Sequence, residues 1–574
     1  MPAVIEVRDL TFRYPGAEVD SLVGVDLTIE RGDFVAVVGG NGSGKTTLCK
    51  TFNGLIPHFW SGEMLGSVHV GGTDTHESSV AALSHQVGYV YQDFGNQLVR
   101  PTVRDDVAFG PINFGLTDHA ERTEQAMAQL GIEHLASTFV WQLSGGQEHL
   151  TALAGVLAMR PEVIVVDEPV AELDPVRAEE TYRMLAQVNA EQGTTIVVIE
   201  HHAEFIARYA RSVVLMAQGA PRWHLPVREA LSRAEELAEH GIPAPQVVQA
   251  VQALAPEAPV PLTVEEAVTA LAGSGVLTGS GVVTGSSAPA EPRATSSRGP
   301  AVARLEGVTH GYRDVHGHLS TVLDDLSLTL HEGERIAVVG SNGAGKSTLL
   351  RLLTGLDVPR VGEVEVEGIS TRSTSAARLA DHVCYLYQHP EQMFLQDSVR
   401  QDIAMFPQQR RRPGTAELVE EILDRLRLRE VADRDGRTLS GGQQRRATLG
   451  IALAMTPALL LLDEPTSSLD VGTRRDVTAM LAALAERIRC VAVATHDMHL
   501  VAEWASRVVV LHGGRVLADT TPAELFDDPD LMAAVHLVPP QVSVLGRALG
   551  IHPPPLSVAE LTARVTQPVA AGVR

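Results

Sequence analysis

Two glycine-rich segments, each followed by a lysine and a hydroxyl residue, carry the clearest chemistry in the sequence. Backbone N–H groups of such a loop can wrap a phosphate, and the helix that follows adds a favourable dipole. The lysine reaches the β- and γ-phosphates of a nucleotide, and the next hydroxyl ligates Mg²⁺. Both segments fit G-x-x-x-x-G-K-[S/T] and predict two nucleotide-phosphate sites: Gly39-Gly40-Asn41-Gly42-Ser43-Gly44-Lys45-Thr46 and Gly340-Ser341-Asn342-Gly343-Ala344-Gly345-Lys346-Ser347.

The lysine content supports this expectation. Of the 46 basic residues, three are lysines (Lys45, Lys50 and Lys346) and the others are arginines. Two of the three stand at equivalent points of the two loops, 301 residues apart. A phosphate loop needs a compact, flexible point charge, which the wider planar guanidinium does not replace. We therefore expect Lys45 and Lys346 to be chemically required, whereas the sequence gives Lys50 no specific role.

Two pairs of acidic residues follow apolar runs. Asp167 and Asp463 end such runs, where a carboxylate can hold Mg²⁺ through its water shell. Glu168 and Glu464 come directly after them and point to the opposite side of the strand end. There they are placed to polarise an attacking water.

The chain is a duplication. LSGGQ occurs at residues 143–147 and 439–443, DEP at 167–169 and 463–465, and PQV at 245–247 and 540–542. The offsets are nearly constant, which indicates two whole copies. Residues 1–225 and 301–525 are expected to form the core domains, and 226–272 and 526–574 their C-terminal appendices. Residues 273–300 have the composition of a flexible Gly/Ser/Pro linker.

Each copy alternates short apolar runs with longer amphipathic segments, which predicts an α/β fold with a mostly parallel sheet. Each appendix starts a helix with a capping-box pattern, Thr263-x-x-Glu266 and Ser557-x-x-Glu560. The runs that read as buried strands are Phe34–Val38, Val163–Val166, Thr195–Ile199, Ile336–Val339, Ala458–Leu462 and Val491–Ala494.

The composition of the chain narrows the class of protein further. The net charge of −24 argues against a surface built to neutralise phosphate backbones. The sequence shows no signal-peptide pattern and no apolar run long enough to span a membrane. Three widely separated cysteines (Cys49, Cys384 and Cys490) read as buried small hydrophobes of a reducing compartment.

The full motif set resembles that of ABC-type ATPases, and the resemblance covers nearly the whole chain. LSGGQ upstream of the aspartate strand is the specific part. The resemblance implies two tandem P-loop NTPase domains, each with a parallel sheet core, a helical subdomain and an appendix, that bind and hydrolyse ATP with Mg²⁺. It assigns adenine stacking to Tyr14 and Tyr312, water and Mg²⁺ sensing to Gln92 and Gln388, and γ-phosphate contact to His201 and His496. Further nucleotide contacts are implied for Thr47, Thr348, Ser144, Gly145, Gly146, Gln147, Ser440, Gly441, Gly442 and Gln443.

In this family, the LSGGQ element of one copy faces the phosphate loop of the other, so ATP is held between two copies that pair within one chain. One site would combine Lys45 and Glu168 with residues 440–443, and the other Lys346 and Glu464 with residues 144–147. Copy 1 departs from the family pattern at two places, so we expect it to be the less typical of the two copies. Leu150 stands where copy 2 has Arg446 and the family usually has a basic residue, and residues 171–174 differ from the family pattern before Leu-Asp.

Segments after the glutamines, residues 96–116 and 388–406, resemble ATPase subunits of energy-coupling-factor importers of vitamins and metals, as do residues 53–59. The resemblance implies a transmembrane coupling protein and a separate membrane substrate-binding component. It places the chain at the cytoplasmic face of the membrane, held only through these partners, without nucleic acid. Asp93 and Glu391 are either contacts for the membrane partner or simply solvated. The alternatives are a soluble twin-ATPase translation factor bound to ribosomes and the ATPase of another importer class.

Overall fold

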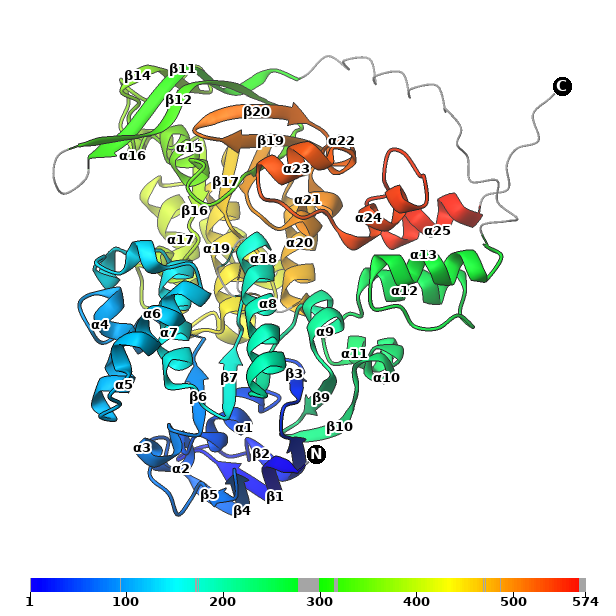
Figure 1. Cartoon of the computed structure of the whole chain (residues 1–574). Helices are drawn as coiled ribbons and strands as arrows, with labels where there is room; N and C mark the ends of the chain where they lie inside the picture. The colour runs from blue at the N-terminus through cyan, green and yellow to red at the C-terminus, as the bar shows by residue number, and fades with distance from the viewer. Residues whose placement is uncertain are drawn as a thin grey trace. The chain divides into compact units, whose positions relative to one another are not determined.

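The computed structural model describes residues 2–276 and 299–566, apart from residues 93, 171, 172, 174, 314–317, 468, 470 and 486 (Figure 1). The chain forms two compact units, Met1–Ser274 and Gly275–Arg574. This division falls inside the linker expected at 273–300. Most of that linker, residues 277–298, lies outside the described residues, as do Asp93 and parts of the two segments before Leu-Asp.

A six-stranded sheet forms the core of the first unit, in the order β10-β9-β3-β8-β7-β6. Its strands run parallel except for β10. Strands β3, β7 and β8 are buried along their whole length, which explains their continuous apolar sequences. The strands predicted in copy 1 are therefore confirmed. The bounds are β3 (Phe34–Val38), β6 (Val87–Val90), β7 (Val163–Asp167), β8 (Thr195–Ile199), β9 (Ser212–Ala217) and β10 (Ala220–Pro226).

A second, antiparallel sheet has the order β2-β1-β4-β5. The first helix packs between the two sheets, since Leu48 and Phe52 share one buried cluster with Val35 and Val37 of β3 and with residues of β1 and β2. This packing fixes the helix at whose start Lys45 lies. The bounds are β1 (Ala3–Arg13), β2 (Leu22–Glu30), β4 (Glu63–Val70), β5 (Thr73–Asp74) and α1 (Lys45–Phe52).

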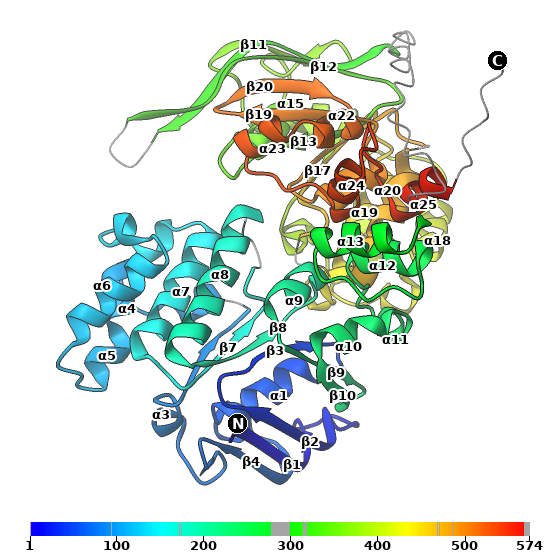
Figure 2. The same ribbon diagram turned by 45° about the vertical axis from the view of Figure 1, so that its right-hand side comes forward.

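A helical subdomain lies against one long helix, α7 (Gly145–Met159), which begins inside LSGGQ. Helices α4, α5 and α6 contact α7 (Figure 2). The remaining helices of the unit are α2 (Leu55–His58), α3 (Val80–Leu83), η1 (Phe94–Gln97), α4 (Val103–Val107), α5 (Phe109–Asn113), α6 (His119–Gln129), η2 (Glu133–Leu135), η3 (Val140–Gln142), α8 (Pro175–Gln192), α9 (Ala203–Tyr209), α10 (Val227–Ser232), α11 (Ala234–Glu239), α12 (Gln246–Leu254) and α13 (Val264–Gly273).

The second unit repeats this plan, with sheets ordered β16-β17-β18-β13-β19-β20 and β12-β11-β14-β15. The strands predicted in copy 2 are confirmed to within a residue. Bounds are β11 (Ala301–Arg313), β12 (Leu319–His331), β13 (Arg335–Val339), β14 (Val361–Val366), β15 (Ile369–Ser370), β16 (Val383–Leu386), β17 (Leu459–Asp463), β18 (Cys490–Ala494), β19 (Arg507–His512), β20 (Arg515–Thr520), α15 (Lys346–Leu353), α16 (Ala376–Leu379), η4 (Pro390–Met393), α17 (Val399–Gln409), α18 (Thr415–Arg425), η5 (Arg429–Val431), η6 (Gly436–Thr438), α19 (Gly441–Met455), α20 (Val471–Ala485), α21 (Met498–Trp504), α22 (Pro522–Asp527), α23 (Pro529–Ala534), α24 (Gln541–Ala548) and α25 (Val558–Thr566).

The last helix of each appendix begins where the capping pattern predicts. The hydroxyls of Thr263 and Ser557 accept hydrogen bonds from the N–H groups of Glu266 and Glu560. Each glutamate carboxylate accepts from the N–H one residue before the cap, at Leu262 and Leu556. The three cysteines are free and buried, as expected. Among the described residues, no helix is both long and apolar enough to cross a membrane.

Candidate functional site

The two glycine-rich loops lie where the sequence predicts, between a buried strand and a helix. Their first glycines, Gly39 and Gly340, have φ values of 145° and 152°. A Cβ at Gly39 would lie 2.2 Å from the carbonyl oxygen of Met216, and one at Gly340 would lie 2.3 Å from that of Leu511. Only glycine fits here, because each loop crosses directly over the backbone of the neighbouring strand.

Each loop lysine folds back over its own loop. Lys45 Nζ donates to the carbonyl oxygens of Gly39 at 2.7 Å and Gly40 at 3.0 Å. Lys346 Nζ does the same to Gly340 at 2.8 Å and Ser341 at 3.3 Å. Both lysines are buried. Each ammonium is therefore held above the cradle in which a phosphate would lie.

The aspartates at the strand ends meet the loop hydroxyls. Thr46 Oγ1 donates to Asp167 Oδ2 at 3.0 Å. Asp463 is hydrogen-bonded to Ser347 and accepts from Tyr385 Oη at 2.8 Å. Burial and the adjacent Glu168 charge raise the pKa of Asp167 to about 6. A hydroxyl beside a desolvated carboxylate is a donor set that Mg²⁺ prefers, so these residues fit a magnesium ion.

The two glutamates have a left-handed backbone, with φ of 56° at Glu168 and 45° at Glu464. A non-glycine residue in this region is strained, and such strain clusters at functional sites. Glu168 Oε2 accepts from Gln92 Nε2 at 3.0 Å, and its Oε1 lies 2.7 Å from His201 Nε2. The structure therefore brings together the two residues that the sequence assigned to the attacking water in copy 1, Glu168 and Gln92, and the histidine assigned to the γ-phosphate, His201.

Copy 2 holds its glutamate differently. Glu464 Oε1 lies 2.9 Å from His496 Nδ1, and Oε2 accepts from Thr495 Oγ1 at 3.2 Å. Within the part of the chain that the structure describes, no hydrogen bond joins the Gln388 side chain to Glu464. Burial opposes the charged form of His496, but its pKa is raised because the charge and the hydrogen bond of Glu464, with the charge of Asp497, together outweigh burial. The pKa of His201 is raised in the same way by Glu168.

The remaining predicted residues flank this centre. Tyr14 Oη lies 3.3 Å from Thr47 Oγ1, and Tyr312 Oη donates to Asp357 at 2.8 Å. In each LSGGQ element the serine caps the helix, and the glutamine side chain accepts the serine N–H, at 3.0 Å for Gln147 and 3.1 Å for Gln443. The capping box thus uses the N–H groups of the serine and the glutamine, and it leaves those of the two glycines between them available to an anion.

Glu200 is a residue of this region that the sequence analysis missed. It is 1% exposed, and its Oε1 accepts from the N–H groups of His201 at 2.7 Å and His202 at 2.9 Å. The ring of His202 and the hydroxyl of Tyr182 also bond to this carboxylate. Although burial opposes it, the charge of His202 lowers the pKa of Glu200 to about 2. The sequence signal that could have identified Glu200 is a carboxylate directly after a wholly buried strand.

Two further residues have partners that the sequence did not assign. The side chain of His202 is 41% exposed, and its Nδ1 lies 2.7 Å from Glu200 Oε1. Lys50, which had no role, places its Nζ 5.1 Å from the ring centroid of Trp60. This cation–π contact ties α1 to the segment after α2 and has no part in the phosphate site.

Comparison with known proteins agrees with this geometry. The ABC transporter family model matches residues 22–171 and 323–467. Proteins with the provisional name ABC transporter ATP-binding protein are similar along nearly their full lengths. One from Enterococcus faecalis is 33% identical over 98% of each chain, and one from Streptomyces avermitilis is 36% identical over 91% of this chain and 94% of its own. One from Methanosarcina mazei is 31% identical over 97% of this chain and 95% of its own.

The chain belongs to the ABC transporter family. It is an ATPase with two tandem ATPase domains, each binding ATP, as the motif set predicted. A solved structure of cbiO1 from Clostridium perfringens, described as part of the ABC transporter complex cbiONQ, is 31% identical; it covers 42% of this chain and 94% of its own, with a TM-score of 0.37.

Replacing either loop lysine by arginine is expected to disable its site at unchanged charge. The lysine ammonium lies in a buried position over the loop carbonyls, where a planar fork does not fit. Lys45→Arg in the Glu464→Gln protein, and Lys346→Arg in the Glu168→Gln protein, should each lower the remaining ATP turnover by about tenfold or more. Lys50→Arg is the matched control, because it keeps its contact with Trp60. Turnover of either loop variant equal to that of the control would contradict the assignment.

Removing either catalytic carboxylate should lower turnover while nucleotide still binds. Glu168→Gln and Glu464→Gln keep the side-chain shape but cannot take a proton from water. Phosphate release measures the first effect and a fluorescent ATP analogue the second. If one variant hydrolyses ATP at the original rate, the site that contains that glutamate is silent in the unmodified protein.

Glu200→Ala should destabilise the first unit by about 3 kcal/mol, because it leaves buried donors of Tyr182, His201 and His202 without an acceptor. Chemical denaturation followed by circular dichroism measures the loss. Glu191→Ala, on the exposed side of α8, is the control and should change stability by less than about 0.5 kcal/mol. Equal stabilities of the two variants would show that the Glu200 network is unimportant.

Proposed function

We propose that this ATPase is the motor of an importer of the energy-coupling-factor type, taking up a small solute such as a vitamin, a vitamin precursor or a metal ion. The observation that carries the proposal is that both copies have a complete set of hydrolysis residues in one chain. The resemblance of residues 53–59, 96–116 and 388–406 to importer ATPases of that type gives the class. The chain would act at the cytoplasmic face of the membrane through partner proteins.

The residues divide the work of hydrolysis between them. In the first site, Lys45 holds the β- and γ-phosphates, and Thr46 and Asp167 would hold Mg²⁺. An ion held there would supply positive charge that neutralises the charge developing on the phosphate during hydrolysis. Glu168 accepts a proton from the attacking water, and Gln92 orients that water. Lys346, Ser347, Asp463, Glu464 and Gln388 have the same roles in the second site, and His201 and His496 contact the γ-phosphates.

The signature elements complete these sites in the proposed closed state. ATP on Lys45 would be covered by residues 440–443, and ATP on Lys346 by residues 144–147. The capped first turn of each signature helix offers N–H groups to the γ-phosphate. Binding of two ATP molecules therefore closes the copies, and hydrolysis reopens them.

The segment after each glutamine is built to meet another protein. Asp106 Oδ1 accepts the N–H groups of Val99 at 2.7 Å and Arg100 at 2.8 Å. Asp402 holds Leu395 and Gln396 in the same way. Val99 and Leu395 are 59% and 66% exposed. A loop fixed from inside that presents an apolar side chain outward supports docking of a helix of a transmembrane coupling protein.

Purification of the protein from its native cell in mild detergent tests the proposal. We expect a membrane coupling protein and a separate membrane substrate-binding component to co-purify. Val99→Asp combined with Leu395→Asp should abolish this recovery while ATP binding is retained. Recovery of ribosomes in place of membrane proteins would overturn the importer proposal and support a translation factor.

A further inference from the structure

Arg445 connects the signature helix of copy 2 to both sides of its hydrolysis centre. It lies in the first turns of α19, two residues after LSGGQ. Its guanidinium donates to the carbonyl oxygens of Tyr387 at 2.8 Å, of Gln388, and of Glu464 at 3.3 Å. One side chain therefore holds the backbone of the glutamine that orients water and of the glutamate that activates it.

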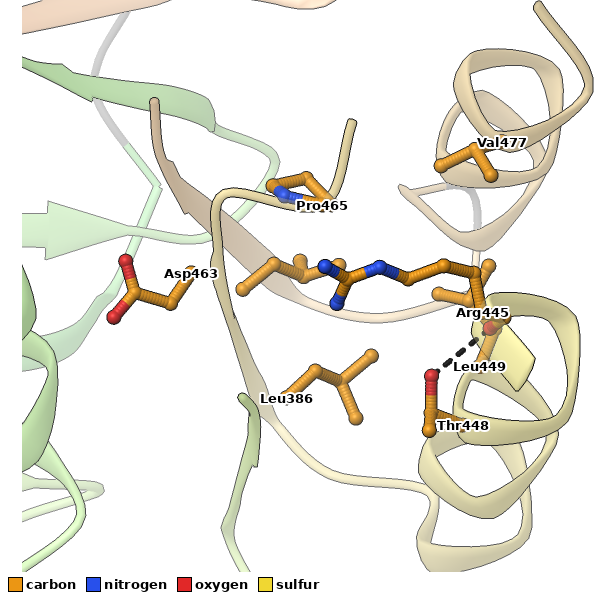
Figure 3. Close-up of a pocket in the computed structure, with 8 residues that line it drawn as sticks. Leu386, Arg445, Thr448, Leu449, Asp463, Pro465 and Val477 are labelled. Carbon is orange, nitrogen blue, oxygen red and sulfur yellow. Dashed lines mark hydrogen bonds between the residues drawn. The ribbon is translucent and has the colours of Figure 1, made fainter. Parts of the chain in front are cut away.

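The surroundings of Arg445 offer little to replace these bonds, although the carbonyl oxygen of Glu464 also accepts the Ser467 N–H at 3.2 Å. The residue is 6% exposed, and its side chain extends from α19 between Leu386 and Pro465 toward Asp463 (Figure 3). The cavity beside it measures about 10 Å³, room for at most one water. Burial lowers the pKa of Arg445 to about 10, so the group stays charged at neutral pH. Its loss would leave three backbone carbonyls without this donor.

Copy 1 has no such link. His149 occupies the equivalent position, is completely buried, and stacks on Phe94 with ring centroids 4.7 Å apart. Neither ring nitrogen has a hydrogen-bond partner among the residues that the structure describes. Phe94 itself stands where copy 2 has Pro390. The pair His149 and Phe94 thus fills the space by ring packing, and at this point the glutamine loop of copy 1 meets its signature helix through stacked rings and not through hydrogen bonds from the residue at position 149.

We propose that Arg445 is a positioning residue that fixes Gln388 and Glu464 relative to each other, so that the site built on Lys346 hydrolyses ATP faster than the site built on Lys45. A catalytic pair held in place by a rigid fork spends less time in unproductive arrangements than a pair held only by its side chains. The difference between the copies lies in the hydrolysis step, because neither Arg445 nor His149 touches the phosphate loop.

The first test compares neighbouring arginines of one helix in the full-length protein. Arg445→His introduces the residue of copy 1 and should lower kcat by about tenfold, with ATP affinity within about twofold. Arg446→Leu also introduces the residue of copy 1, but Arg446 donates to Leu426 and Arg427 at the end of α18. It should leave kcat within about twofold. Equal losses in both variants, or a parallel loss of ATP binding in Arg445→His, would overturn the proposal.

The second test compares the two sites directly. Glu464→Gln should remove a larger share of turnover than Glu168→Gln, and equal shares would overturn the inequality of the sites. Transplanting the copy 2 pair into copy 1, as Phe94→Pro with His149→Arg, should raise the residual turnover of the Glu464→Gln protein. If this double variant folds, as judged by circular dichroism, and its turnover does not rise, the link made by Arg445 is not what separates the copies.

Discussion

Two adjacent carboxylates at the end of a buried strand are the constraint on which each site depends. Asp167 and Asp463 are the last residues of β7 and β17, which are buried throughout, and Glu168 and Glu464 follow them directly. Like charges this close disfavour one another, and burial adds to the cost. The left-handed backbone at each glutamate turns the second carboxylate away from the first. The aspartate then meets the hydroxyl of the phosphate loop, whereas Glu168 bonds to Gln92 and His201, and Glu464 bonds to Thr495 and His496. Each carboxylate thus has its own set of partners.

Much of this arrangement could be predicted from sequence, because certain patterns have direct backbone consequences. A glycine-rich loop before a lysine defines a phosphate cradle, and a continuous apolar run that ends in Asp-Glu defines a buried parallel strand. Thr263 and Ser557 begin helices where they were expected. These features are local, so the chain around each residue contains the information that determines its structure.

Features that depend on tertiary contacts were missed or misplaced. The sequence drew attention to Leu150 and Arg446, but Arg446 supports the end of α18 and its neighbour Arg445 reaches the site. Successive residues on a helix point about 100° apart, so which one faces the centre depends on how the helix packs. Arg445 acts on Gln388, 57 residues earlier in the chain. Glu200 was missed because its partners Tyr182 and His202 come from different elements.

In both copies the pKa of the histidine is raised, but the neighbouring carboxylate comes from a different position in the sequence. In copy 1 the buried carboxylate precedes it, as Glu200, and in copy 2 it follows it, as Asp497, which caps α21 and accepts from Thr466. The histidine contacts its glutamate through Nε2 in copy 1 and Nδ1 in copy 2. A buried charge near the histidine is therefore the common requirement, while its position in sequence can vary. The two phosphate loops show no such variation: Lys45 and Lys346 are both buried and donate to the carbonyl oxygen of the first loop glycine at 2.7 and 2.8 Å, a position that suits a compact point charge.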